Sequence, residues 1–380
     1  GFSTAYNADG TVSASAEMYE DTILECTWDT EAGHFVGEGS IAALPQEPES
    51  IYKSLRYGTE KFLHQCGIKK MTIGLSGGID SAITAAMYAD ILGAENVLLI
   101  NLPSVYNSET TKNIAYNLAK NLGANYAVIP ISHSCEHTEE QLTSTPITNM
   151  ASGSTFNLEL SNIVKENIQA RDRGARIIAA ASAAFGGAFS CNSNKAEITV
   201  GYCTFYGDIC GALAMIGDLW KHQVYALGRY MNEAIFKREV IPEEIFTIRP
   251  SAELASTQTV GTGGDPLIYE YHDYLLASFV ENWHKTTPAD ILRWYKAGTL
   301  AQELGCEEDV ITNAFPTPAE FIADLERWWK LFAGFSVAKR IQAPPIMSIT
   351  KRAFGYDHRE AQLTPYFSRE YYKLKEELLK

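Results

Sequence analysis

A short apolar run, Met71–Leu75, ends in the glycine-rich turn Ser76-Gly77-Gly78 and leads into an apolar segment of helical length. A buried strand that passes through such a turn into a helix is the opening of a βαβ unit. Two adjacent glycines let the backbone turn tightly with its N–H groups pointing inward, and the helix N-terminus adds a partial positive charge. The segment therefore predicts a parallel α/β sheet with an anion site at the end of its first strand.

The strand–helix rhythm continues along the chain. Further strands are predicted at Val97–Ile100, Tyr126–Ile131 and Ala188–Cys191, and helices at Tyr52–Cys66, Ala82–Leu92, Thr110–Leu122, Ile163–Phe185 and about Trp220–Phe236. Repeated units of this length predict an α/β fold, a doubly wound parallel sheet with helices on both faces. Helices near Pro288–Leu304 and Pro318–Phe332 predict a helical C-terminal extension. The polar stretch Thr143–Asn157 is too long for an ordinary connection and is interpreted as a lid or mobile loop.

Residues 1–46 have a different pattern. Thr4–Val12 is typical of a strand that ends in the Asp9-Gly10 turn, and Thr22–Trp28 alternates like a second strand. Two isolated strands are marginal alone, and Pro45–Pro48 has the character of a linker. We therefore predict two domains, residues 1–46 and 47–380.

Composition excludes several classes of partner. Lys and Arg number 31 against 46 Asp and Glu, so the net charge is 31 − 46 = −15, which argues against a nucleic acid partner. The longest charge-free apolar stretch, Ile177–Asn194, is mostly Ala, Gly and Ser, so no membrane span is expected. Seven cysteines form no C-x-x-C pair, which favours free thiols and a cytoplasmic location.

The glycine-rich turn carries the chemistry. Ser76 and Ser81 supply hydroxyl groups, and Asp80 supplies a hard oxygen ligand of the kind that Mg²⁺ prefers. The turn lacks the Gly-Lys-Ser/Thr of a Walker loop and the G-x-G-x-x-G of a dinucleotide fold. Gly74–Gly78 also matches the G-x-S-x-G elbow of α/β-hydrolases. The hydrolase interpretation is disfavoured because no H-G-G-G segment precedes the turn and the hydrolase mechanism does not require an aspartate at the position of Asp80.

Ser76-Gly77-Gly78-Ile79-Asp80-Ser81 resembles the pyrophosphatase loop of the ATP-cleaving synthetases. Further segments, in order over about residues 49–360, resemble the NAD⁺ synthetase family, and in particular the synthetase half of its glutamine-dependent members. These segments are Asn101–Ser104, Glu166–Arg171, Asn194–Glu197, Gly201–Asp208, Ile216–Lys221, Pro250–Leu254, Lys339–Pro345 and Arg352–Gly355. The resemblance implies a fold like that of the adenine nucleotide alpha hydrolases.

The resemblance also implies the reaction. The family adenylates the nicotinate carboxylate of deamido-NAD⁺ with ATP, releases pyrophosphate, and lets ammonia displace AMP. ATP and Mg²⁺ are then required, with Asp80 and Glu197 as the metal ligands and Asp80, Asp208 and Lys221 as the catalytic residues. The ATP-binding residues would be Gly74, Ser76, Gly77, Gly78, Ile79, Asp80, Ser81, Asn192 and Lys221. The deamido-NAD⁺-binding residues would be Asn167, Arg171, Glu197, Tyr202, Thr204, Asp208 and Lys339.

Three positions depart from the family pattern. Asn192 stands where Thr is usual, Val105 stands where a basic residue is usual, and Val260-Gly261 replaces acidic residues. Without the match, Glu197 and Lys221 would be interpreted as solvated helix charges. A nucleotide-binding scaffold without activity therefore remains an alternative to the enzyme.

The first 46 residues resemble the closing strands of the nitrilase-like glutaminase domain that precedes the synthetase in this family. The catalytic Glu, Lys and Cys of that domain would lie upstream. We therefore expect this polypeptide to use free ammonia and not to hydrolyse glutamine. The resemblance further implies a homodimer formed through the synthetase domain.

Overall fold

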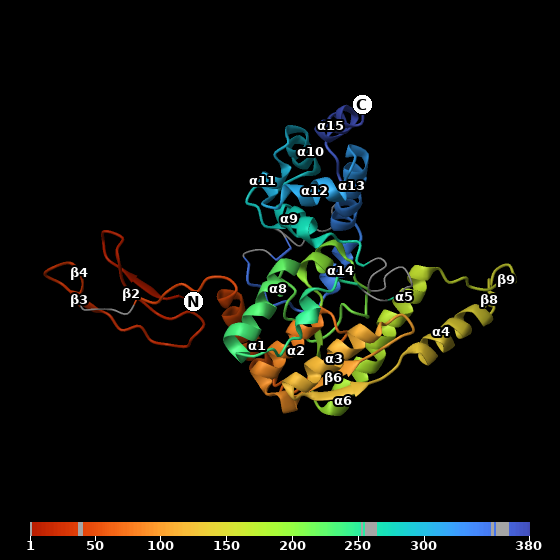
Figure 1. The fold of residues 1–380 in the computed structure, drawn as a ribbon, viewed down its shortest axis with the longest axis horizontal. Coiled ribbons are helices and arrows are strands. Elements are labelled where there is room, and N and C mark those ends of the chain that lie inside the picture. Colours follow the sequence, from red (N-terminus) through yellow and green to blue (C-terminus); the bar gives the residue numbers. More distant parts are fainter. Residues whose placement is uncertain (1, 37–40, 252–253, 255–263, 351–352, 355–364) are drawn as a thin grey trace. The chain divides into compact units, whose positions relative to one another are not determined.

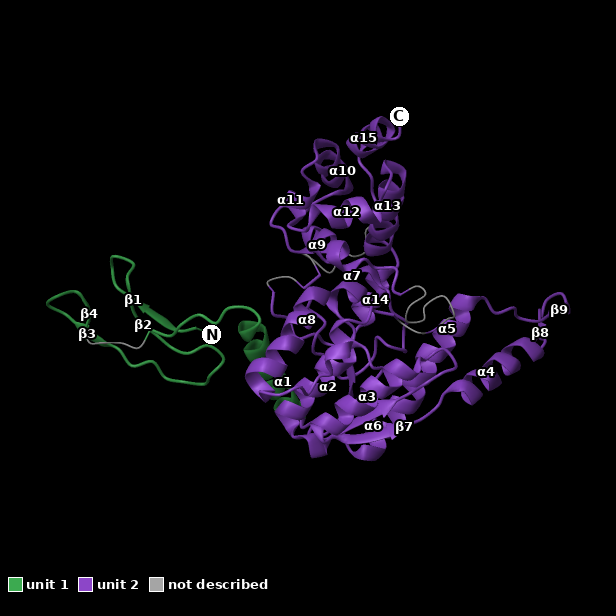
Figure 2. Cartoon of the chain, in the orientation of Figure 1, with its two compact units in different colours: residues 1–66 green, residues 67–380 purple. Residues whose placement is uncertain are grey.

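The structure is a computed structural model that describes residues 2–36, 41–251, 254, 264–350, 353–354 and 365–380. The chain divides into two compact units, residues 1–66 and 67–380 (Figure 2). The predicted division fell at residues 46 and 47. Helix α1 (Glu49–Cys66), which the prediction assigned to the second domain, instead belongs to the smaller unit. The identity of the two domains stays a prediction.

The smaller unit contains two antiparallel hairpins and α1. Its strands are β1 (Thr4–Tyr6), β2 (Val12–Ser15), β3 (Thr27–Asp29) and β4 (His34–Val36), with β1 paired to β2 and β3 to β4. The predicted Asp9-Gly10 turn joins β1 to β2, and Asp9 Oδ1 accepts hydrogen bonds from both the backbone N–H and the hydroxyl of Thr11. The predicted strand Thr22–Trp28 is regular only from Thr27, because residues 21–26 take no strand pairing in the structure.

A five-stranded parallel sheet forms the base of the larger unit. Its strands lie in the order β11-β10-β5-β6-β7 and are β5 (Met71–Gly74), β6 (Val97–Asn101), β7 (Asn125–Val128), β10 (Ala188–Cys191) and β11 (Leu213–Ala214). The chain starts in the middle, moves outward through β6 and β7, and then returns to build the other half. This order confirms the predicted doubly wound fold.

Helices cover both faces of the sheet (Figure 1). Helices α2 and α3 pack on β5, β6 and β7, whereas α6 and the π-helical turn before it pack on β5 and β10. Their bounds are α2 Ile79–Leu92, α3 Glu109–Leu122, α5 Asn162–Arg171, the π-helix Asp172–Ile178 and α6 Ala179–Phe185. The predicted helix Ile163–Phe185 is therefore a run of α5, the π-helix and α6.

Helix α2 is buried over most of its length. Its residues Ala82–Tyr88 are all buried, so it is apolar on every side and held between β5, β6, α3 and α8. Burial of this run costs little side-chain entropy because three of the seven residues are alanine. The start of α2 is consequently fixed relative to the strand before it, which matters for the site below.

One predicted long loop of this unit contains regular secondary structure. Thr143–Asn157 was expected to be a lid or mobile loop, but it comprises the end of helix α4 (Ser132–Ser144) and the hairpin of β8 (Ile147–Thr148) and β9 (Thr155–Phe156). Cys135 is the one buried residue of α4, so the apolar spacing that marks a helix in sequence is missing there.

The remainder of the larger unit is mostly helical. Helices α7 (Lys195–Val200), α8 (Lys221–Tyr230) with the π-helix Met231–Phe236, and a 3₁₀ turn at Glu243–Phe246 complete the sheet domain. The extension contains α9 (Tyr269–Val280), α10 (Pro288–Ala297), α11 (Leu300–Leu304), α12 (Glu308–Ala314), α13 (Pro318–Ala333), α14 (Ser336–Gln342) and α15 (Arg369–Leu378). Its core includes Trp328 and Trp329, and Gly298 (φ 71°) separates the predicted helix Pro288–Leu304 into α10 and α11.

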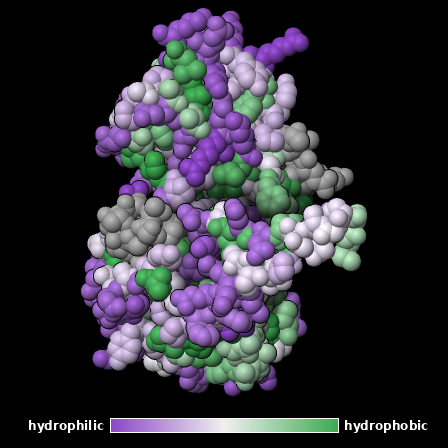
Figure 3. Space-filling view, turned by 90° about the vertical axis from the view of Figure 1, so that its right-hand side faces the viewer, coloured by the Kyte–Doolittle hydropathy of each residue, from purple (hydrophilic) through white to green (hydrophobic). Residues whose placement is uncertain are grey.

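The molecular surface in Figure 3 shows separate apolar patches divided by polar residues on the face that it presents. Among the described residues, no helix combines the length and apolar character that crossing a bilayer demands.

Candidate functional site

The sheet places two loops side by side at its carboxyl edge. Strands β5 and β10 are parallel neighbours, and the chain leaves them toward opposite halves of the sheet. Such a reversal opens a crevice beyond the strand ends, where ligands bind in doubly wound folds. The loop after β5 is the glycine-rich turn, and the loop after β10 leads into α7.

The turn after β5 depends on Gly77. Its φ is +91°, and a Cβ added there would lie 2.2 Å from the backbone oxygen of Thr111. Ser76 and Ser81 close the turn, with their Oγ atoms 3.1 Å apart. The N–H of Gly78 donates to Ser76 Oγ at 3.1 Å. Gly78 is the N-cap of α2 and has no side chain, so no side chain of the cap residue covers the first amide groups of the helix.

The loop after β10 is held by two asparagines. Asn192 Nδ2 donates to the backbone oxygen of Gly74 at 3.0 Å, which joins the two strand ends. Asn194 is the N-cap of α7: its Oδ1 accepts from the N–H of Glu197 at 3.1 Å, in a capping box. Its Nδ2 donates to Glu197 Oε1 at 2.8 Å and to Asp80 Oδ1 at 3.3 Å. Asn194 therefore bridges two carboxylates from opposite halves of the sheet.

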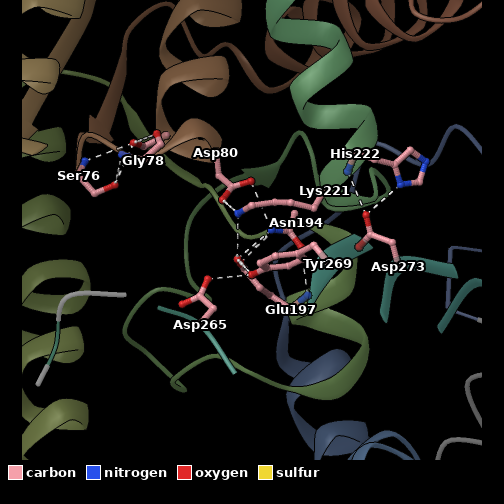
Figure 4. Close-up of polar contacts among 11 residues, drawn as sticks. Ser76, Gly78, Asp80, Asn194, Glu197, Lys221, His222, Asp265, Tyr269 and Asp273 are labelled. Atoms are coloured by element: carbon pink, nitrogen blue, oxygen red, sulfur yellow. Dashed lines mark hydrogen bonds and ion pairs between the residues drawn. The ribbon is translucent and has the colours of Figure 1, made fainter. Parts of the chain in front are cut away.

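A buried ammonium lies between these carboxylates. Lys221, the first residue of α8, has its Nζ atom 2.5 Å from Asp80 Oδ2 and 3.7 Å from Glu197 Oε1 (Figure 4). Burial raises the pKa of Glu197 to about 8, and Asp80 adds to the effect while Lys221 opposes it. Burial alone would lower the pKa of Lys221, but Asp80 and Glu197 raise it above its ordinary value. The lysine is therefore charged, and it pairs most closely with the carboxylate of Asp80.

The start of α9 completes the cluster. Tyr269 donates from its hydroxyl to Asp265 Oδ2 at 2.9 Å and lies 3.3 Å from Glu197 Oε1. Its ring centroid is 4.7 Å from Lys221 Nζ. Burial is the first cause that raises the pKa of Tyr269, so the hydroxyl keeps its proton.

Two cavities meet at this cluster. One of about 370 Å³ is lined by the turn after β5, the carboxylate–lysine cluster and the segment after α7. The other, of about 280 Å³, lies between the ends of β5, β6 and β10 and the π-helix. Ser76, Asp80, Ser81, Glu197 and Asp208 line both cavities, so the two form adjoining parts of one site.

Most of the predicted site residues line these cavities. From the ATP set, Ser76, Gly77, Gly78, Ile79, Asp80, Ser81 and Lys221 line the first cavity, and Gly74 and Asn192 line the second. From the deamido-NAD⁺ set, Asn167, Glu197, Tyr202, Thr204, Asp208 and Lys339 line the first. Arg171 lines neither, and its Nε instead donates to the backbone oxygen of Phe205 at 3.1 Å.

The segment after α7 forms the far wall of the first cavity. Thr204 ties it together, because its N–H donates to Asp208 Oδ1 at 2.6 Å and its hydroxyl donates to Asn167 Oδ1 at 2.8 Å. Lys339 donates to the backbone oxygens of Gly201, at 2.7 Å, and Cys203. Burial raises the pKa of Asp208 above its ordinary value.

Three buried polar atoms at the cavities have acceptor or donor capacity left. Within the described part of the chain, Oδ1 of Asn101, Oδ1 of Asn192 and the hydroxyl of Tyr202 have no hydrogen-bond partner. Asn101 and Asn192 line the second cavity and Tyr202 lines the first. Because burying such atoms unpaired is costly, they indicate positions where a ligand would bond.

The hydrolase alternative loses its support here. A serine nucleophile needs an adjacent base, yet no histidine lines either cavity among the residues that the structure describes. Ser76 Oγ is used in the turn itself.

Some predictions cannot be located. Val260, Gly261, Ala252, Glu253, Arg352 and Gly355 lie outside the described residues. Val105, which replaces a basic residue, is 74% exposed and lines neither cavity, so the substitution leaves the described pocket walls unchanged.

Sequence reasoning missed three members of the cluster. Asn194 stood in the motif Asn194–Glu197, and its position three residues before a Glu is the signal of a capping box. Asp265 and Tyr269 carried no such signal, since Tyr269 opens an apolar helix and is typical of a core aromatic there.

Comparisons with known proteins identify the family of this chain. A family model described as NAD synthase matches residues 51–313. The glutamine-dependent NAD(+) synthetase of Synechocystis sp. is 34% identical over 356 residues, which cover 93% of this chain and 56% of that protein. The Thermotoga maritima protein of the same name is 37% identical over 251 residues, which cover 66% of this chain and 41% of that protein. The chain thus spans about half the length of the curated relatives that it matches.

Solved structures support the fold. The glutamine-dependent NAD+ synthetase of Acinetobacter baumannii, solved with adenosine diphosphate, aligns with a TM-score of 0.55 and 25% identity over 91% of this chain and 55% of that one. A glutamine-dependent NAD(+) synthetase from Cytophaga hutchinsonii aligns with a TM-score of 0.63 at 17% identity, over 92% of this chain and 61% of that one. These likenesses confirm the predicted fold class.

Proposed function

Since this chain belongs to the NAD synthase family, we propose that it amidates deamido-NAD⁺ to NAD⁺ at the expense of ATP, with AMP and pyrophosphate as the other products. The observation that carries the proposal is the junction of an anion-binding turn with Asp80, Glu197 and Lys221 at one cavity. An anion site beside paired carboxylates and a cation suits phosphoryl chemistry.

The chemistry requires activation of a carboxylate. Ammonia cannot displace oxide from the nicotinate group, so the carboxylate oxygen first attacks the α-phosphorus of ATP, and the bond to the β-phosphate oxygen breaks. Ammonia then attacks the acyl carbon, gives up a proton, and AMP leaves. Positioning and charge stabilisation supply most of the catalysis in such reactions.

The turn after β5 would hold the departing pyrophosphate. The amide groups around Gly77 and at the start of α2 point a partial positive charge at this place, and Lys221 adds a full charge. The second cavity, with Asn101 and Asn192 at its wall, would take the adenine half of ATP, because an exocyclic amino group can donate to their unpaired oxygens.

The donor set suits Mg²⁺. No group of three or more metal-binding acids, histidines or cysteines occurs among the described residues, but Mg²⁺ commonly takes one or two carboxylates together with substrate phosphates. Asp80 and Glu197 already converge on one cation, the ammonium of Lys221. They would hold the ion, which neutralises phosphate charge when bound.

Deamido-NAD⁺ would lie against the far wall of the first cavity. Tyr202, Asn167 and Thr204 offer neutral hydrogen-bonding groups and Lys339 a cation. Asp208, whose pKa is raised by burial, would accept a proton from the incoming ammonia. Arg171 would reach the ligand only after giving up its bond to Phe205.

A direct assay tests the function. The purified protein is incubated with ATP, Mg²⁺, deamido-NAD⁺ and ammonium, and the products are identified by mass. We expect AMP, pyrophosphate and NAD⁺ in equal amounts. Nucleotide binding without any of these products would favour the inactive scaffold.

The metal site has its own test. Asp80→Asn and Glu197→Gln each remove one negative charge with little change in shape, and either should abolish Mg²⁺-dependent AMP formation while far-ultraviolet circular dichroism stays unchanged. Retained turnover in both variants would show that the ion is held elsewhere.

The nitrogen source and assembly are also proposals. Ammonia is the proposed nucleophile, so we expect label from ¹⁵N-ammonium to appear in the NAD⁺. Absence of that label from the NAD⁺ would contradict this. We expect a homodimer, which light scattering after gel filtration would detect.

A further inference from the structure

Tyr269 contacts three charged residues at the site, Asp265, Glu197 and Lys221. It lies at the first turn of α9, in a part of the chain far from the turn after β5, and is 7% exposed. Its hydroxyl reaches Asp265 at 2.9 Å and Glu197 at 3.3 Å, and its ring faces Lys221 at 4.7 Å (Figure 4).

We propose that Tyr269 is a positioning residue with two separable roles: its hydroxyl orients Glu197 for the cation, and its ring retains the Lys221 ammonium. The inference rests on the proposed function, since it concerns the residues that would hold Mg²⁺ and pyrophosphate there.

The hydroxyl role follows from the contacts of Glu197. A glutamate side chain has three rotatable bonds, and holding it in one geometry costs free energy unless neighbouring groups fix it. Oε1 accepts from Asn194 Nδ2 at 2.8 Å and lies within reach of the Tyr269 hydroxyl. Asn194 caps α7 and Tyr269 lies in α9, so the two residues contact Oε1 from two different elements and restrict where it can lie.

The hydroxyl is itself held in place. It donates to Asp265 Oδ2, which precedes it by four residues in the same segment. Asp265 thus anchors the tyrosine hydroxyl, and the tyrosine in turn anchors the glutamate.

The ring role follows from the position of Lys221. In the structure its ammonium bonds Asp80, the same carboxylate that is proposed to hold Mg²⁺. When a cation is held there, Lys221 must give up that contact. An aromatic face at 4.7 Å attracts the ammonium without competing for the carboxylate, so the lysine stays beside the anion turn.

Two substitutions separate the roles. Tyr269→Phe removes the hydroxyl and keeps the ring, whereas Tyr269→Leu removes both. Cation affinity is measured with Mn²⁺ by electron paramagnetic resonance, in the presence of α,β-methylene-ATP, which cannot release pyrophosphate. Turnover and its Mg²⁺ dependence are measured in parallel.

We expect Tyr269→Phe to bind Mn²⁺ about 10-fold more weakly, the change that the loss of one hydrogen bond to a carboxylate produces. Its turnover at saturating Mg²⁺ should stay within about twofold of the wild type, because Lys221 keeps its aromatic neighbour. Tyr269→Leu should show the same weakening and, in addition, a loss of about 10-fold in turnover at saturating Mg²⁺.

Tyr271→Phe is the matched control. Tyr271 lies on the same helix and is also buried, but its ring packs against Phe315 and Phe321 in the core of the extension. It loses the same hydroxyl, so Mn²⁺ affinity and turnover should equal those of the wild type.

Unchanged Mn²⁺ affinity in Tyr269→Phe would overturn the hydroxyl role, and equal turnover in the Phe and Leu variants would overturn the ring role. If Tyr269→Leu does not fold, as judged by thermal melting, the ring role is read from Tyr269→Met. If the wild-type protein binds Mn²⁺ and the ATP analogue but forms no NAD⁺, the proposed function is refuted. The role of the Tyr269 hydroxyl is then still tested by the Mn²⁺ affinities of the wild type and Tyr269→Phe.

Discussion

At the scale of single residues, Gly77 has neither the backbone conformation nor the space for a side chain. Its positive φ disfavours any residue with a Cβ, and the space that a Cβ needs is already taken by the backbone of Thr111, at 2.2 Å. The backbone of Thr111 cannot move aside as a flexible side chain could, because Thr111 is part of helix α3. The shape of the anion turn is therefore fixed by the packing of α3 against it.

Gly77→Ala should consequently displace the turn. We expect ATP-dependent turnover to fall about 100-fold, as a shift of about 1 Å in a catalytic group can produce. The measurement is the rate of pyrophosphate release at saturating ATP and Mg²⁺.

Gly123→Ala is the matched control for this change. Gly123 also has a positive φ, 72°, but nothing lies within 4 Å of an added Cβ. It should lose only about 1 kcal/mol of unfolding free energy and keep its turnover. Equal losses of turnover in the two variants would show that backbone strain, and not the Thr111 contact, is responsible.

The residues of the site were predictable to different degrees. Asp80, Glu197 and Lys221 belong to local motifs, and the structure brings them together as the family resemblance implied. Asp265 and Tyr269 were not predictable, because their role arises from where α9 begins in space. No local pattern distinguishes Tyr269 from Tyr271, two positions later, which lies in the core.

At the scale of elements, Glu326 joins two helices of the extension. It lies on α13 and is hydrogen-bonded by Tyr371, at 2.9 Å, and by Lys375, both on α15; Lys330 of its own helix adds a bond at 3.0 Å. Burial alone would raise the pKa of Glu326, but Lys375, Lys330 and Tyr371 lower it to about 2. Because the pKa is lower in the folded state, the stabilisation is present above about 4.5 and is lost as pH falls toward 2.

Glu326→Gln should therefore lower the free energy of unfolding at pH 7 by roughly 1–3 kcal/mol, the range for hydrogen bonds to a charged group. The difference from the wild type should shrink as urea denaturation is repeated between pH 4.5 and pH 3. Glu377→Gln, which removes an exposed pair with Lys296, is the control and should change little. A difference that stays constant with pH would contradict the pKa of Glu326.

Elements were predicted well where burial leaves a clear pattern. The strand Ala188–Cys191 has the predicted bounds, and the predicted strand and helix around the anion turn agree with β5 and α2 to within a few residues. Helix α4 and the hairpin of β8 and β9 were missed because nearly all of their side chains are at least partly exposed, so hydrophobic periodicity is absent.

At the scale of the whole unit, Lys195 links parts of the chain that are distant in sequence. Its side chain is 0% exposed and pairs with Asp218 at 2.8 Å and Glu281 at 2.5 Å. Asp218 in turn accepts hydrogen bonds from the N–H groups of Ile349 and Thr350, both at 2.7 Å. One buried ammonium thus connects α7, the segment before α8, the residue after α9 and the segment after α14.

Lys195→Met should destabilise the larger unit by about 3–5 kcal/mol, because removal of one partner leaves Asp218 buried without its cation. Guanidinium denaturation followed by circular dichroism measures the loss. Lys195→Met combined with Asp218→Asn should recover part of it. A loss below about 1 kcal/mol would show that water reaches the pair and screens it.

The double use of Asn194 has a consequence for how the site can be observed. The side chain that caps α7 through the N–H of Glu197 also bridges the carboxylates of Asp80 and Glu197. Any ligand that tightens this bridge also closes the first turn of α7, so the Glu197 amide should exchange its hydrogen for deuterium more slowly when ATP and a divalent cation are bound. A single backbone amide would then report occupancy of the site without a label on any substrate.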